Sequence, residues 1–76
     1  MITPSQCRGA RAMLKMKLPD LSEAAGISVS TINSFELERR QPTKANLSAI
    51  QRALEAAGVR FTERGVEIAD TQEKTS

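Results

Sequence analysis

The chain has 76 residues, 39% of them hydrophobic, and a net charge of +2, which suits one small globular domain with a modest core. It has no histidine and one cysteine, Cys7, so it lacks the commonest general base and metal ligand, which argues against an enzyme, a metal site or a cofactor. It has no apolar run long enough to span a membrane and no start typical of a signal peptide, so we expect a cytoplasmic protein.

The first helix is expected from Pro4 to about Met16. Thr3 can cap it, Pro4 fits its first position, and Gln6 lies at the capping-box position. Apolar residues then recur at helical spacing: Cys7, Ala10, Met13 and Leu14. We expect Cys7 to be a small, half-buried residue without a reactive role, because a lone thiol lacks a histidine partner.

Proline and glycine delimit two short helices in the middle of the chain. Pro19 interrupts the first pattern and opens a second helix, which Gly26 ends because glycine readily takes the left-handed conformation. Ser28 caps a third helix that runs from Val29 to about Leu37. The inner face of the second helix is expected to be Leu21, Ala24 and Ala25. That of the third is expected to be Ile32, Phe35 and Glu36.

A fourth helix is expected from about Lys44 to Ala57, with an apolar stripe of Leu47, Ile50, Ala53 and Leu54. The charges are segregated along the chain, because residues 1–17 and 39–52 each carry four basic residues and no acidic one. These two blocks could fold into one positive face that binds a polyanion, or they could simply be solvated surface.

After Gly58 the hydrophobic period changes to the alternation that is typical of strands. The two runs predict a hairpin, with Gly65 in a left-handed bulge position of the connection. A register that pairs Phe61 with Val66 also sets Arg60 against Glu67 and Val59 against Ile68, so that both faces are chemically consistent. The elements together predict a mainly α fold of four helices with a short C-terminal β-hairpin. We expect a domain over residues 1–58, the hairpin over 59–69 and a disordered tail over 70–76.

The most informative stretch is LSEAAGISVSTINSFE, residues 21–36, in which a tight glycine turn joins two short helices. This pattern is typical of a helix-turn-helix, whose second helix enters the major groove of DNA. Its alanine-glycine-isoleucine-serine turn, its threonine-isoleucine pair and its following glutamate resemble the XRE or phage-repressor-like helix-turn-helix family. The resemblance covers roughly residues 3–58. It implies a non-enzymatic, sequence-specific transcription regulator that binds double-stranded DNA, with no small-molecule ligand evident.

The resemblance also implies roles for individual residues. The base contacts would be Val29, Ser30, Asn33 and Ser34. The contacts to the DNA backbone would be Lys17, Ser28, Thr31, Arg39, Arg40 and Lys44. Arg11 would form a structural ion pair with Glu36, because two inward charges need each other. The family usually opens the second helix with a glutamine that holds a phosphate, but here that position is Leu18, which cannot donate a hydrogen bond.

Proteins of this kind usually dimerise to bind two half-sites one helical turn apart. The apolar face of the hairpin is therefore a candidate dimer contact, formed by Val59, Phe61, Val66 and Ile68, although it could instead cover the protomer's own helices. Three hypotheses remain for the function. The chain is a dimeric repressor or controller at an inverted-repeat operator, the antitoxin of a toxin–antitoxin pair, or a protein-interaction module of the same fold.

Overall fold

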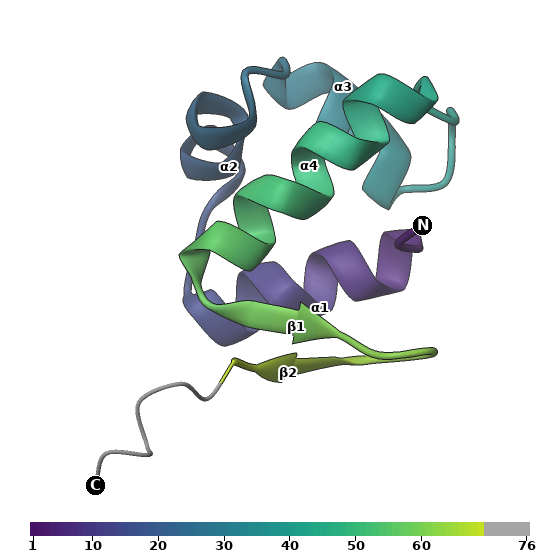
Figure 1. Cartoon of the computed structure of the whole chain (residues 1–76). Helices are drawn as coiled ribbons and strands as arrows, with labels where there is room; N and C mark the ends of the chain where they lie inside the picture. Colours follow the sequence, from purple (N-terminus) through teal and green to yellow (C-terminus); the bar gives the residue numbers. More distant parts are fainter. Residues whose placement is uncertain (70–76) are drawn as a thin grey trace, which may run out of the picture.

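A computed structural model describes residues 1–69, so the tail expected over 70–76 lies outside the described residues. Within them the chain forms four helices and two strands (Figure 1). In chain order these are α1 (Pro4–Leu14), α2 (Leu18–Ala25), α3 (Val29–Glu36), α4 (Lys44–Ala57), β1 (Val59–Phe61) and β2 (Val66–Ile68). The predicted mainly α fold with a C-terminal hairpin is confirmed.

The helices enclose an apolar core to which every helix and β1 contribute. Its buried members are Ile2, Cys7, Ala10, Leu21, Ile32, Phe35, Leu47, Ile50, Leu54 and Val59. The hairpin lies along α1, on the side away from α2 and α3 (Figure 1). Phe61 and Val66 also pack against the core, so the hairpin belongs to the same packed unit as the helices.

Helix α1 begins as predicted and ends earlier than predicted. Thr3 Oγ1 accepts a hydrogen bond from the backbone N–H of Gln6 at 3.1 Å, and Gln6 Oε1 accepts one from the N–H of Thr3 at 2.8 Å, which confirms the capping box. The prediction that the helix extends to Met16 is wrong by two residues. Lys15 adopts a left-handed conformation with φ 55°, and this turns the chain out of the helix after Leu14.

Three expected burials differ from the structure. Cys7 is completely buried instead of half-buried, because its face of α1 lies against the core. Met13, three residues beyond Ala10, is 41% exposed. Ala24 is exposed as well, since α2 turns Leu21 and Ala25 toward the core.

The hairpin has the predicted register, with Phe61 opposite Val66, Arg60 opposite Glu67 and Val59 opposite Ile68. Arg60 and Glu67 form an exposed ion pair at 2.6 Å, as the register requires. The prediction of a left-handed Gly65 is wrong, because the described glycines with positive φ are Gly26 and Gly58.

The connection between the strands is closed instead by Thr62. Its hydroxyl accepts a hydrogen bond from the N–H of Gly65 at 2.9 Å, and its own N–H donates to the carbonyl of Gly65 at 3.0 Å. The side chain of Gln6 donates to the carbonyls of Thr62 and Gly65, at 2.8 and 3.0 Å, and so fastens this connection to α1.

Burial divides the residues expected at a dimer contact. Val59 is 2% exposed inside the protomer's own core, so it is not available for a dimer contact in this fold. Phe61 and Val66 are half-buried against that core. Ile68, at the end of β2, is 50% exposed.

Candidate nucleic-acid interface

The unit formed by α2 and α3 is shaped by the turn between them. Gly26 has φ 71°, a left-handed conformation that favours glycine, and its N–H donates to the carbonyl of Ser22 at 2.9 Å. The Ser22 hydroxyl donates to the carbonyl of Ile27 at 2.6 Å, and the Ile27 side chain packs against the core. The turn is therefore held from both sides, and it fixes the direction in which α3 leaves α2.

Helix α3 begins with a hydroxyl cap. Ser28 Oγ accepts a hydrogen bond from the N–H of Thr31 at 3.1 Å and donates its own proton to Thr31 Oγ1 at 2.9 Å. This arrangement leaves the hydroxyl proton of Thr31 available to an outside acceptor. The first-turn amides of Val29 and Ser30 have no partner within the helix, so the start of α3 can receive an anion such as a phosphate.

The two faces of α3 differ in chemistry. Ile32 and Phe35 are buried in the core, and Glu36 is 3% exposed. The four residues expected to contact bases lie on the opposite side of the helix: Val29, Ser30, Asn33 and Ser34. Val29 is 38% exposed, Ser30 is exposed, and Asn33 and Ser34 are half-buried. Their spacing places them on one face, which offers a methyl surface, two hydroxyls and one amide.

Cationic side chains border this face. Arg39 and Arg40 follow α3 in the loop that leads to α4, and Lys44 is the first residue of α4; all three are exposed. Lys17 is exposed at the start of α2. The expected backbone-contact residues are therefore all at the surface except Thr31, which is half-buried. Positive charge at these positions suits a polyanionic partner.

The start of α2 is less suited to a phosphate. The carboxylate of Asp20 accepts a hydrogen bond from the N–H of Lys17 at 3.0 Å, and Pro19 has no N–H to offer. Leu18 is half-buried and packs against the core. The residue that departs from the family pattern therefore serves packing, and the helix start holds a negative charge of the protein's own.

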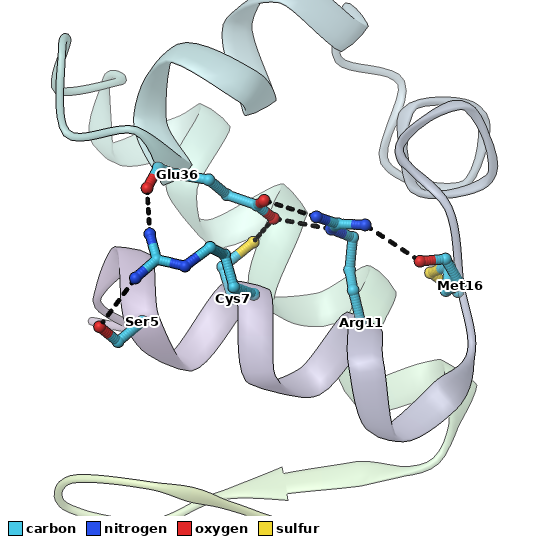
Figure 2. A network of polar contacts seen from close by, with 6 residues as sticks. Ser5, Cys7, Arg11, Met16 and Glu36 are labelled. Carbon is cyan, nitrogen blue, oxygen red and sulfur yellow. Dashed lines mark hydrogen bonds and ion pairs between the residues drawn. The ribbon is translucent and has the colours of Figure 1, made fainter.

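The inner side of α3 is anchored to α1 by charge. The guanidinium of Arg11 donates to both oxygens of Glu36, from Nε to Oε2 at 2.8 Å and from NH2 to Oε1 at 2.6 Å (Figure 2). A further bond runs from Arg11 NH1 to the carbonyl of Met16 at 3.1 Å. The ion pair expected between Arg11 and Glu36 is thus present, and it joins the middle of α1 to the end of α3.

The surroundings of Glu36 shift its pKa in opposite directions. Burial of the carboxyl acts to raise the pKa, but hydrogen bonds from Arg11 and Cys7 and the positive charges of Arg11 and Arg8 outweigh it. The pKa of Glu36 is therefore lowered, and the carboxylate stays ionised. The pKa of Arg11 is raised, chiefly by its hydrogen bond to Glu36.

Two contacts of this site escaped the sequence interpretation. The Cys7 thiol donates to Glu36 Oε2 at 3.0 Å, and Arg8 NH1 donates to the backbone carbonyl of Glu36 (Figure 2). Cys7 lies four residues before Arg11 and so on the same face of α1, which was the available signal. Arg8 carried no signal, because nothing in its spacing shows that it reaches a main-chain carbonyl.

Other kinds of site find no support in the described part of the chain. Among residues 1–69, no three His, Cys, Asp or Glu side chains gather as they would around a metal ion. No helix in that range is long and apolar enough to cross a membrane.

Comparison with models of known protein families gives a match. The model of a family described as "Helix-turn-helix" matches residues 8–57, which include all of α2, α3 and α4 and most of α1. No curated protein matches the chain. The matched range contains every residue assigned above to base contact, backbone contact or the ion pair, and it ends before the hairpin.

Proposed function

Because the chain belongs to the XRE-type helix-turn-helix family of DNA-binding transcription regulators, we propose that it is a repressor or controller that binds an inverted-repeat operator as a homodimer. The observation that carries this proposal is the division of α3 into a buried inner face and a polar outer face bordered by cations. We further infer that it acts by binding and without catalysis, since the chain has no histidine to serve as a general base. We also propose that it acts in the cytoplasm.

In the proposed complex α3 lies in the major groove. The exposed methyl groups of Val29 suit the methyl of a thymine, and the amide of Asn33 can form two hydrogen bonds with an adenine. The hydroxyls of Ser30 and Ser34 can donate to or accept from several bases. This outer face carries no charge, so we expect the choice of sequence to come from hydrogen bonds and shape while affinity comes from residues around it.

The backbone contacts would come from two sides of α3. The start of α3 presents the Thr31 hydroxyl and the first-turn amides of Val29 and Ser30, at a point where the helix dipole also favours an anion. Arg39, Arg40 and Lys44 supply positive charge after its end. Because Asp20 places a carboxylate at the start of α2, we expect Lys17 to make any phosphate contact there as a point charge.

The second copy in the homodimer is proposed to add at β2. Among the described residues, the backbone bonds of β2 are those of the hairpin itself, so its outer edge is open to another strand. A twofold axis through Glu67 would set two like charges opposite each other, whereas an axis through Ile68 would pair two exposed isoleucines. The second arrangement is favoured. Ile68 would lie at its centre, and Phe61 and Val66 would pack between the sheet and the core of each protomer.

Selection of bound sequences from random duplexes by the purified chain tests the proposal. Enrichment of an inverted repeat with half-sites about one helical turn apart supports a dimeric regulator. Enrichment of a single short site would support DNA binding by a monomer. No enrichment, even in dilute buffer, would contradict the proposal and favour the interaction module of the same fold.

A further inference from the structure

The C-terminal end of α3 receives three side chains from a single turn of α1 (Figure 2). Arg11 binds both carboxylate oxygens of Glu36, and the Cys7 thiol donates to one of them, Oε2, at 3.0 Å. Arg8 donates to the main-chain carbonyl of the same residue. Glu36 is the last residue of α3, so these bonds hold the end of the helix through both its side chain and its backbone.

We infer that Cys7 is a positioning residue for the DNA-binding surface, whose thiol acts with Arg11 and Arg8 to fix the end of α3 through Glu36. The inference rests on the proposed function, since the surface that it positions is the proposed base-contact face. The ion pair expected from the sequence does not include this contact.

The position of Cys7 explains why a thiol is useful there. The side chain is completely buried and touches the core, where an aliphatic residue would fill the space equally well. An aliphatic residue, however, would leave Glu36 Oε2 with the single bond from Arg11 Nε in a site that water does not enter freely. A thiol is small and apolar enough for the core and still donates a hydrogen bond.

The protonation of Cys7 supports this role. Burial and the neighbouring Glu36 carboxylate raise the pKa of the thiol, so at neutral pH it keeps the proton that it donates. The ionisable groups of the described residues that act on Glu36 are Cys7, Arg8 and Arg11, all from α1. Cys7 is therefore a hydrogen-bond donor and not a nucleophile, and its burial shields it from reagents.

The bonds at Glu36 matter for the outer face because α3 is only eight residues long. Its start is fixed by the Ser28 cap and the turn after Gly26, and its end is fixed by Glu36. A binding surface must be held by such supporting bonds if its side chains are to meet their partners in register. Loosening the end of α3 should therefore weaken duplex binding without removing any residue that touches DNA.

The test compares Cys7→Ala and Cys7→Ser with the wild-type chain in two measurements. The first is the pKa of the Glu36 carboxyl, followed by the carbon-13 shift of that group in an NMR titration. The second is affinity at neutral pH for the duplex enriched from the random pool. We expect C7A to raise the pKa of Glu36 and to lower affinity about fivefold, the loss expected from one hydrogen bond.

C7S should restore both values toward wild type, because the serine hydroxyl reaches Glu36 with a slightly longer bond. Val59→Ala is the matched control, since it truncates another buried core residue whose side chain has no group that could donate a hydrogen bond to Glu36. It should destabilise the fold and leave the Glu36 pKa unchanged.

An unchanged Glu36 pKa or unchanged affinity in C7A would overturn the inference. So would C7S behaving like C7A, or V59A shifting the Glu36 pKa as much as C7A does. A wild-type chain that binds no duplex would contradict the proposed function instead, and the titration would then still decide whether the thiol holds the end of α3.

Discussion

Arg11 and Glu36 form a two-point ion pair between α1 and α3, with both carboxylate oxygens bound at 2.6 and 2.8 Å. The two partners are unequally buried, since Glu36 is 3% and Arg11 20% exposed. Such a pair gains little over well-packed apolar residues, but removing one partner strands the other in a poorly hydrated site. The placement of α3 therefore depends on the buried charge of Glu36, which is not part of the exposed face of the helix.

Glu36→Gln should lower the free energy of unfolding by about 3 kcal/mol at pH 7, because it removes the charge that compensates Arg11. Urea denaturation followed by circular dichroism measures the change. Glu67→Gln is the control, since its ion pair with Arg60 is exposed and should contribute less than about 1 kcal/mol.

The difference in the free energy of unfolding between wild type and E36Q should also become smaller at acidic pH. The pKa of Glu36 is lowered in the fold, so its contribution is complete above the ordinary carboxyl range and is lost as the pH falls through the lowered value. Equal effects of E36Q and E67Q, or a difference that grows in acid, would contradict the assignment.

Alkaline pH should destabilise the wild-type chain through Cys7. Its pKa is raised in the fold, so as the pH rises above 9.0, the ordinary value, the unfolded thiol ionises while the folded one stays neutral. Stability should therefore fall with pH in that range more steeply than in Cys7→Ser, whose hydroxyl does not titrate. Parallel profiles from pH 8 to 10.5, measured by denaturant unfolding under reducing conditions, would show that the thiol is not held protonated.

Asn33→Ala should relax the preference for one base pair in each half-site of the selected sequence. The amide is the side chain on the outer face of α3 best suited to a two-bond contact with adenine, and such a contact contributes about 1–3 kcal/mol of discrimination. Repeating the selection with the variant measures the effect. Asn46→Ala is the control, since that residue lies on α4, and a preference that survives in N33A would remove Asn33 from the base contacts.

Arg39→Ala should weaken binding to all duplexes by a similar factor, because a phosphate contact carries no sequence information. The slope of log affinity against log salt concentration should become shallower by about 1. Arg64→Ala removes another exposed arginine, from the hairpin connection, and should leave the slope unchanged. If both variants change the slope equally, general electrostatics and not a contact by Arg39 would be the cause.

Ile68→Lys should shift the chain from dimer to monomer in sedimentation experiments, since it places two like charges at the centre of the proposed strand pair. Leu37→Lys is the control, since it changes a side chain of the same size and similar exposure that directly follows α3 and lies outside the hairpin. Loss of the dimer in L37K but not in I68K would move the contact to the α3–α4 loop.

Much of the fold follows from local rules. Capping residues and glycines located the starts of α1 and α3 and the end of α2, because they satisfy backbone groups within a few residues. The strand register also followed from the sequence, since a shift by one residue would have set Val59 opposite Glu67 and Arg60 opposite Val66.

The errors concern features that depend on distant parts of the chain. Helical spacing grouped Met13 with Ala10, but it could not show that the hairpin covers α1 at Gly9, beside Val66, and leaves Met13 exposed. The closure of the hairpin by Thr62, and the bond from Gln6 to its connection, involve groups that no short pattern links. Of the candidate site, the sequence showed which face of α3 is polar and which residue pairs with Glu36, but it did not show the bonds from Cys7 and Arg8 to the end of the helix.

The recognisable family pattern stops at residue 57, yet the core continues into Val59 and Phe61. A fragment that ends after Ala57 would lack the hairpin and would expose the apolar surface of α1 that the hairpin covers. The Gln6 amide would also lose both of its carbonyl partners in the hairpin. A fragment for biophysical work should therefore extend to residue 69. A fragment that ends at the boundary of the family match would expose apolar core surface and would be prone to aggregation.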